Sequence, residues 1–251
     1  MADAPLTILH EDPWLVAIAK PPGLAVHRSE QVRDRAPALQ RLRDQLGRRV
    51  YPVHRLDRAT SGVLLFALDP HTARRVGEAL ARRDVDKRYV AVVRGWAPTE
   101  AEIDHPLREE PERAPQPAHT SLRRLATVEL PIPVGRYPQA RYSLVELVPH
   151  TGRLHQLRKH LAHLRHPIVG DVRHGEGRHN RLFREHLGIR RLLLHAWWLA
   201  LPHPHHDRPL RIRAPLDDEL RGLLQRLGWA EAGLTCDRSP PGSLPSASSA
   251  T

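Results

Sequence analysis

The apolar residues of this chain fall in short runs separated by turn residues, and this spacing limits the folds open to it. The runs are rich in branched side chains and end at Pro, Gly or Asp, a pattern typical of β-strands. Strands outnumber predicted helices, and their connections vary in length. The pattern favours an α+β fold around a mostly antiparallel mixed sheet flanked by helices and loops. The expected strands span residues 7–10, 15–20, 63–68, 89–93, 125–129, 142–148, 192–201 and 210–213.

Helical periodicity is found in four segments, residues 36–46, 70–83, 154–164 and 217–227. Asp69 before Pro70 is a helix N-cap signal, and Asp217 provides another. The proline-rich, charged stretch 104–118 has no apolar period and is predicted to be an exposed loop that could touch a substrate.

Length and composition predict one domain and a tail. A chain of 251 residues can bury a substantial core, and we expect residues 1–237 to form a single domain. Residues 238–251 are rich in Ser, Pro and Ala and are expected to be disordered. Cys236 is the only cysteine, which excludes an intramolecular disulfide and fits a reducing, cytoplasmic location.

The charge indicates a polyanionic partner. Lys and Arg number 39 against 28 Asp and Glu, so the formal net charge is +11. Such a field attracts nucleic acid or an anionic membrane surface. No segment reaches the roughly 20 apolar residues of a membrane span, and no basic amphipathic anchor is visible, which favours nucleic acid. A compositional bias of the sequence that favours Arg together with Ala, Pro and His would also produce a positive net charge, without any functional cause.

Asp57 has an unusual setting for a carboxylate, with Arg55 and Arg58 on either side of it just before a predicted buried strand. The flanking cations favour its ionised form, while burial would oppose it. The arginines would also suit the backbone of an anionic ligand. The ordinary alternative is a loop ion pair or a turn hydrogen bond, and the spacing alone does not decide against it.

A second basic segment, 150–160, contains Gly152, Arg153 and Arg158 at a predicted helix start. Arg158 would lie beside the apolar helix face, where a long side chain can reach a partner, or else point into solvent. Tyr89 could stack on a base, although an aromatic residue in a strand usually belongs to the core.

The histidines invite a metal hypothesis that we disfavour. His160 and His163 share a helix face, and residues 203, 205 and 206 are a histidine cluster predicted to lie in an exposed turn between strands. No cysteine or suitably spaced carboxylate accompanies them. We therefore predict no metal site.

Six blocks, taken in order, resemble the RluA-type pseudouridine synthases, which convert uridine in RNA to pseudouridine. The matching blocks are Leu15–Gly23, His54–Gly62, Lys87–Tyr89, Thr151–Arg158, His166–Asp171 and Leu194–Ala196. They extend over about residues 6–214. The resemblance implies a single pseudouridine synthase domain. Because the chain opens directly on the first strand, we expect no S4-type RNA-binding domain.

The resemblance also implies roles for individual residues. It makes Asp57 the catalytic carboxylate, Arg158 its ion-pair partner and Tyr89 the ring that stacks on the target base. Arg55 would fill the gap left by a flipped nucleotide, and Leu194 would line the base pocket. Arg58 and Arg153 are the further candidates for binding RNA. The implied reaction leaves the oxidation state unchanged, so no redox cofactor or nucleotide energy source is expected, and we predict no cofactor and no metal.

Within the family, three stretches are similar to the members that modify uridine 65 of tRNA. They are Arg43–Gly47, Leu125–Glu129 with Gly135–Pro138, and His160–His166. The expected partner is therefore RNA, specifically tRNA, with no DNA or membrane partner and a monomeric enzyme. Three alternatives remain: the same chemistry on ribosomal RNA or another tRNA site, a catalytically silent RNA-binding protein, and a metal-dependent hydrolase.

Overall fold

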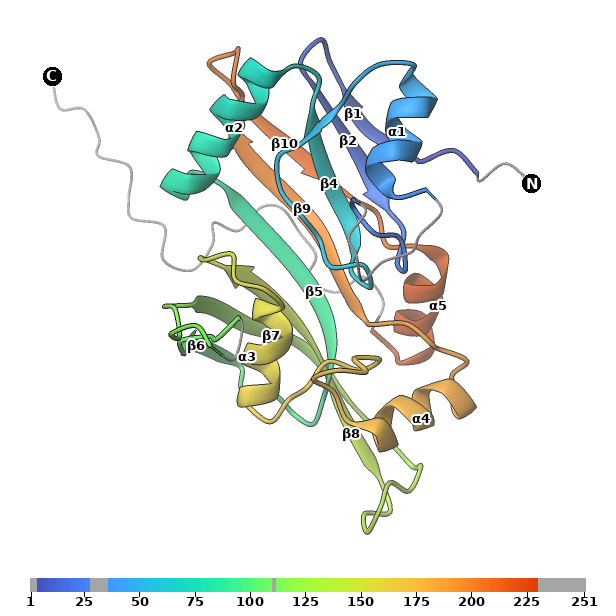
Figure 1. Cartoon of the computed structure of the whole chain (residues 1–251). Coiled ribbons are helices and arrows are strands. Elements are labelled where there is room, and N and C mark those ends of the chain that lie inside the picture. The colour runs from blue at the N-terminus through green and yellow to red at the C-terminus, as the bar shows by residue number, and fades with distance from the viewer. Residues whose placement is uncertain (1–3, 28–35, 110–111, 230–251) are drawn as a thin grey trace, which may run out of the picture.

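One continuous sheet organises the part of the chain that the computed structural model describes, residues 4–27, 36–109 and 112–229 (Figure 1). Its strands run in the order β1-β2-β4-β9-β5-β8-β7-β6, with β10 paired to β9 and β3 paired to β4. The strands are β1 (Ile8–Glu11), β2 (Leu15–Lys20), β3 (Tyr51–Pro52), β4 (Ser61–Ala67), β5 (Asp86–Arg94), β6 (Glu100–Asp104), β7 (His119–Leu130), β8 (Ala140–Pro149), β9 (Leu194–Pro202) and β10 (Pro209–Arg213). The helices are α1 (Ala38–Leu46), α2 (Pro70–Arg82), α3 (Gln156–His163), α4 (Gly177–His186) and α5 (Asp218–Arg226).

Every strand pairing in the described sheet is antiparallel except that of β4 with β9. That one parallel contact covers two residue pairs, Ser61 with His195 and Gly62 with Ala196. The predicted α+β architecture with a mostly antiparallel mixed sheet is therefore confirmed.

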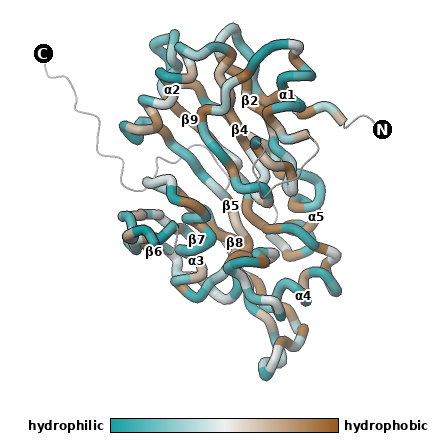
Figure 2. Tube along the Cα trace, viewed as in Figure 1, coloured by the Kyte–Doolittle hydropathy of each residue, from teal (hydrophilic) through white to brown (hydrophobic). Residues whose placement is uncertain are grey.

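Both faces of the sheet are covered, because alternate residues of a strand point to opposite sides. On β2, Val16 and Ile18 pack toward α1, whereas Leu15 and Ala17 pack toward α2. On β5, the odd residues face α3 and the even ones face α4 and α5. Figure 2 shows hydrophobic colouring along the central strands and hydrophilic colouring around β6. One face thus carries α1 and α3, and the other carries α2, α4 and α5.

The predicted elements are found, with shifted ends. The strand expected at 125–129 extends over His119–Leu130, and the helix expected from residue 154 begins at Gln156. The caps at Asp69 and Asp217 are confirmed, since their side chains accept from the backbone N–H of Thr72 and Leu220. No helix of the described residues is both long and apolar enough to cross a membrane.

Three elements escaped prediction because they lack the expected apolar pattern. The edge strand β6 is largely acidic and buries only Ile103, so pairing with β7 defines it. β3 has two residues and contains Pro52. α4 buries only Leu182 and Phe183 and has no side-chain cap. Each depends on tertiary contacts rather than on local sequence.

Two loop predictions need comment. Of the loop expected at 104–118, residues 105–109 and 112–118 form no helix or strand, but Asp104 ends β6, and the expected exposure is wrong for Leu107 and Ala118, which are buried. The histidine cluster does lie between β9 and β10, but the prediction that it is exposed is wrong for His203. That residue is buried, and its Nε2 lies 3.0 Å from Oδ2 of Asp12. The tail 238–251 lies outside the described residues.

Gly62 permits the parallel contact that joins the two halves of the sheet. Its φ is +115°, and a Cβ there would lie 2.1 Å from the carbonyl oxygen of Ala196. A side chain would therefore meet backbone that cannot move without breaking the β4–β9 pairing.

We expect Gly62→Ala to lower the free energy of unfolding by about 3 kcal/mol or more, because steric overlap adds to backbone strain. Denaturant unfolding measures the change. Gly77→Ala in α2 is the matched control, since nothing lies within 4 Å of its added Cβ. In that helix alanine should stabilise by up to about 1 kcal/mol. Equal effects of the two substitutions would contradict this account of Gly62.

Candidate active site

A cleft of about 480 Å³ opens on the face of the sheet that carries α1 and α3. It lies where two hydrophobic clusters meet, and Tyr89 packs against both. The volume falls within the roughly 300–1,000 Å³ of typical ligand sites. The lining residues that matter below are Arg55, Asp57, Lys87, Tyr89, Arg153, His155, Arg158 and Leu194.

The segment that carries Asp57 is fixed from both sides. Leu56 is buried in the cluster beneath α1, and the backbone N–H of Thr60 donates to the carbonyl of Asp57 over 3.0 Å. Lys20, at the end of β2, is 1% exposed, and its ammonium donates to the carbonyls of Pro21, Leu24 and Arg58. A buried cation with three carbonyl acceptors is well satisfied, so Lys20 holds the residue after Asp57 in place.

Arg158 links two carboxylates from distant parts of the chain. Its Nη1 donates to Oδ2 of Asp57 over 3.1 Å. Its Nε and Nη2 donate to the two oxygens of Asp171 over 2.7 and 2.8 Å. The bidentate pair with Asp171 fixes the plane of the guanidinium, which leaves Nη1 directed at Asp57.

Exposure separates the roles of the two carboxylates. The Asp171 side chain is 1% exposed, and it also accepts from the backbone N–H groups of Arg173 and His174. The Asp57 side chain is 19% exposed and faces the cleft. Asp171 is thus the internal anchor, and Asp57 is the carboxylate that a ligand can reach.

The surroundings keep this network charged. Burial opposes ionisation of Asp171, but hydrogen bonds from Arg158 and two backbone N–H groups outweigh it, so its pKa is lowered. Burial likewise opposes the charge on Arg158, yet both carboxylates raise its pKa. At neutral pH, Arg158 is a cation held between Asp171 and Asp57.

Tyr89 and Leu194 form the apolar wall of the cleft. Tyr89 lies on β5 and Leu194 at the start of β9. Burial raises the pKa of the Tyr89 hydroxyl, and the nearby charge of Asp57 raises it further. The ring therefore stays a neutral phenol. Burial lowers the pKa of Lys87, which also lines the cleft.

His155 lies close to Asp57 in an unusual conformation. Its φ of +56° is left-handed, directly before α3, and its Nε2 lies 3.9 Å from Oδ2 of Asp57. Its Nδ1 is 3.0 Å from Nε2 of His174. Burial lowers its pKa to about 4, so the ring is neutral at pH 7 despite the adjacent carboxylate.

The structure brings most of the predicted site residues together. Asp57, Tyr89, Arg158 and Leu194 line the cleft, as do the exposed Arg55 and the half-buried Arg153. Arg58 does not line it; its Nε donates to the carbonyl of Gly23 over 2.9 Å. This places Arg58 among the residues that fix the loop.

Four contributors were not singled out from the sequence: Lys20, Lys87, His155 and Asp171. Each lies within a block that carries the family resemblance, which is the signal that could have found them. The bond between Asp171 and Arg158 depends on the turn after α3, which spacing alone does not reveal. The arrangement offers a carboxylate paired with Arg158, a neutral aromatic ring and several basic side chains around one cleft.

Similarity to known proteins agrees with this geometry. Residues 14–163 match the family described as RNA pseudouridylate synthase. The chain is 51% identical over 235 residues to tRNA pseudouridine synthase C of Salmonella typhi, covering 89% of this chain and 90% of that protein. It is 49% identical to the protein of the same name from Vibrio cholerae, over 90% and 98% of the two chains.

Solved structures agree as well. The structure of Human RNA Pseudouridylate Synthase Domain Containing 4 superposes with a TM-score of 0.69 at 28% identity, covering 88% of this chain and 93% of that one. The chain belongs to the RNA pseudouridylate synthase family and is an isomerase of uridine in RNA.

Proposed function

We propose that this enzyme converts a uridine of tRNA, at position 65, to pseudouridine, with Asp57 as its catalytic carboxylate. The observation that carries the mechanism is the ion network Asp57–Arg158–Asp171 in the wall of the cleft. The tRNA substrate rests on relatives named tRNA pseudouridine synthase C, which align over about nine-tenths of the chain.

Asp57 acts on the nucleoside so that uracil detaches, turns and rejoins the sugar through C5. This requires a carboxylate aimed at the substrate, and the guanidinium of Arg158 orients Asp57 through an ion pair and a hydrogen bond. Asp171 positions Arg158 and does not touch the substrate. No step changes an oxidation state, so the proposal needs no redox cofactor.

Base flipping explains the shape of the cleft. A uracil must leave the RNA stack to reach a recessed carboxylate. The neutral ring of Tyr89 and the apolar side chain of Leu194 offer surfaces for the extruded base. Arg55, exposed at the cleft mouth, is suited to fill the space that the base vacates.

The cationic rim suits an RNA backbone. Arg55, Lys87 and Arg153 line both this cleft and a second pocket that adjoins it. Their charges would contact phosphates on either side of the target nucleotide. All the groups named here come from one chain, so we propose that a monomer suffices, working in the cytoplasm where tRNA is found.

Ribosomal RNA and other tRNA positions are the competing substrates. Mapping of pseudouridine at nucleotide resolution in tRNA and ribosomal RNA from a deletion strain separates them. Loss of modification at tRNA position 65 alone supports the proposal, whereas loss at a ribosomal site replaces it.

We expect Asp57→Asn to lower pseudouridine formation on unmodified tRNA transcripts by about a thousandfold or more, because the amide has no negative charge. Tritium release from 5-tritiated uridine measures the rate, and mapping identifies the nucleotide. RNA binding should survive. Asp218→Asn, 97% exposed on α5 and on the opposite face, is the matched control. Full activity of the Asp57 variant would refute the mechanism.

Asp171→Asn tests whether Asp171 holds Arg158 in position. Removing one charge of the buried network should lower the free energy of unfolding by about 3 kcal/mol at pH 7. A misplaced Arg158 should lower turnover on the order of a hundredfold.

The pH dependence of stability checks the same substitution. The pKa of Asp171 is lowered in the folded protein, so its contribution is present above about pH 4 and is lost as pH falls further. Asp171→Asn should therefore remove part of the acid-induced loss of stability below about pH 4, as measured by denaturant unfolding. An unchanged pH profile would show that Asp171 is not an anchor of this kind.

Arg153→Ala tests the phosphate contacts. Affinity for tRNA should fall, and the slope of log affinity against log salt should become shallower by about 0.7 for the lost contact. Arg226→Ala is the control, because Arg226 is exposed on α5 at the opposite face. Filter binding or fluorescence anisotropy across salt concentrations gives both slopes. Identical slopes for wild type and Arg153→Ala would exclude this contact.

A further inference from the structure

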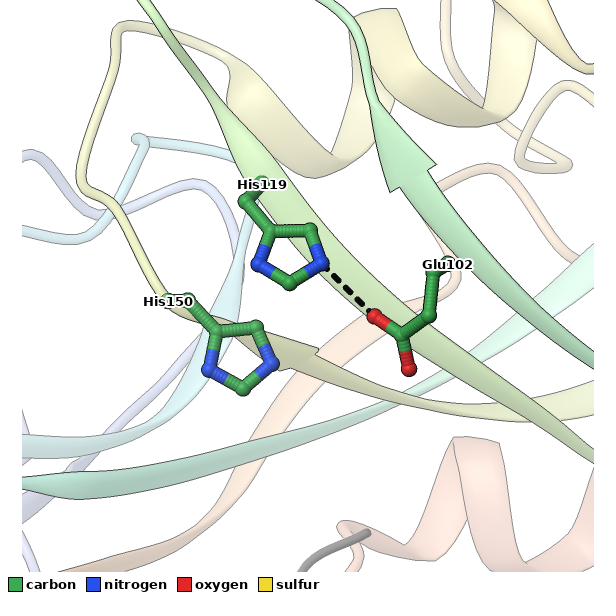
Figure 3. Close-up of side chains that lie close together, drawn as sticks. All are labelled: Glu102, His119 and His150. Carbon is green, nitrogen blue, oxygen red and sulfur yellow. Dashed lines mark hydrogen bonds and ion pairs between the residues drawn. The ribbon is translucent and has the colours of Figure 1, made fainter. Parts of the chain in front are cut away.

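Three metal-ligating side chains meet outside the cleft of Asp57, next to the second pocket that adjoins it, which His119 and His150 help to line. Glu102, His119 and His150 each offer one ligand atom, and these atoms all lie within 4.8 Å of one another. Figure 3 shows both imidazole rings and the carboxylate directed toward a common space. Among the residues that the structure describes, no other group of three His, Cys, Asp or Glu side chains meets this distance.

Strand register explains the convergence. Glu102 on β6 lies opposite Ser121 on β7, and His119 is two residues away on the same face of β7. His150 follows the end of β8, and its backbone N–H donates to the carbonyl of His119 over 3.0 Å. The intervening Thr120 points the other way, toward α3, where its hydroxyl meets Gln156. The strands β6 and β7 and the turn after β8 thus deliver one ligand each.

We propose that Glu102, His119 and His150 bind one zinc-class divalent ion. Two imidazole nitrogens and one carboxylate oxygen are a ligand set that Zn²⁺ uses with a fourth position open to water. Nε2 of His119 lies 2.7 Å from Oε2 of Glu102. Ligand atoms around a tetrahedral zinc lie roughly 3.3 Å apart, so small side-chain rotations would admit the ion.

The local chemistry favours ligation. The Ser121 hydroxyl lies 2.8 Å from Oε2 of Glu102 and 2.6 Å from Nε2 of His150. When a metal ion separates the Glu102 carboxylate from Nε2 of His119, the Ser121 hydroxyl can still hold that carboxylate in place.

The side chains are also accessible to an ion from solvent. Those of His119 and Glu102 are 41% and 56% exposed. The two imidazole rings are stacked, with their centroids 4.6 Å apart.

The ion would brace the turn that leads to the catalytic network. His150 is followed by Thr151, whose hydroxyl accepts from the backbone N–H of His119 and donates to Gln156. Gln156 begins α3, which carries Arg158 two residues later. The proposed site thus ties β6, β7 and the turn 150–152 together behind the cleft. It supports position and takes no part in the reaction.

Metal titration of untagged, chelator-treated protein tests the proposal. Wild type should bind one Zn²⁺ per chain with a micromolar or tighter dissociation constant, measured by calorimetry and by metal analysis after dialysis. Co²⁺ should give the visible absorption of a tetrahedral site, and saturating Zn²⁺ should raise the midpoint of thermal unfolding. His119→Gln and His150→Gln should each weaken binding at least tenfold and remove the Co²⁺ absorption.

His163→Gln is the matched control. It removes one ring of another stacked pair, His105 with His163, and should bind Zn²⁺ as wild type does. Circular dichroism verifies the fold of each variant. Glu102→Gln, at an exposed position, provides the deciding measurement if a histidine variant unfolds. The proposal is overturned if wild type shows no saturable binding, or if binding survives loss of the cluster residues or disappears in His163→Gln.

Discussion

The bond network around Arg158 is the interaction on which the site depends. Arg158 as a residue is only 7% exposed, and its cation would be costly to bury alone, so Asp171 compensates it with two hydrogen bonds. Asp171 uses Nε and Nη2 of Arg158, and Nη1 donates to Asp57. The carboxylate in the wall of the cleft therefore has a fixed partner. The two carboxylates differ in burial. The buried Asp171 stabilises the cation of Arg158, and the more exposed Asp57 stays available to the substrate.

The network can form only because the sheet brings distant segments together. Asp57 precedes β4, Tyr89 lies on β5 and Arg158 on α3, and in the sheet β9 lies between β4 and β5. The β4–β9 contact is the parallel one, and it requires the bare backbone of Gly62 against Ala196. Lys20 then ties the end of β2 to the loop beside Asp57. The contacts of Gly62 and Lys20 therefore hold both the sheet and the site in place.

Periodicity predicted the strands and helices that bury an apolar face, because burial imposes the pattern. It missed β6 and α4, whose residues are mostly polar and whose structure depends on neighbouring elements. For the site, residue types in an ordered set of blocks indicated Asp57, Tyr89 and Arg158. The bond to Asp171 and the place of Arg58 outside the cleft were beyond prediction, since both depend on the paths of loops.

The same argument explains why the cluster of Glu102, His119 and His150 is invisible in the sequence. Spacings of 17 and 31 residues match no short metal motif, and β6, which supplies the carboxylate, is not recognisable as a strand. Once β6 pairs with β7, the register alone places Glu102 beside His119. An edge strand rich in acidic residues is usually explained as protection against edge-to-edge pairing. Here one of those carboxylates also faces two imidazole rings, and avoiding aggregation does not require that arrangement.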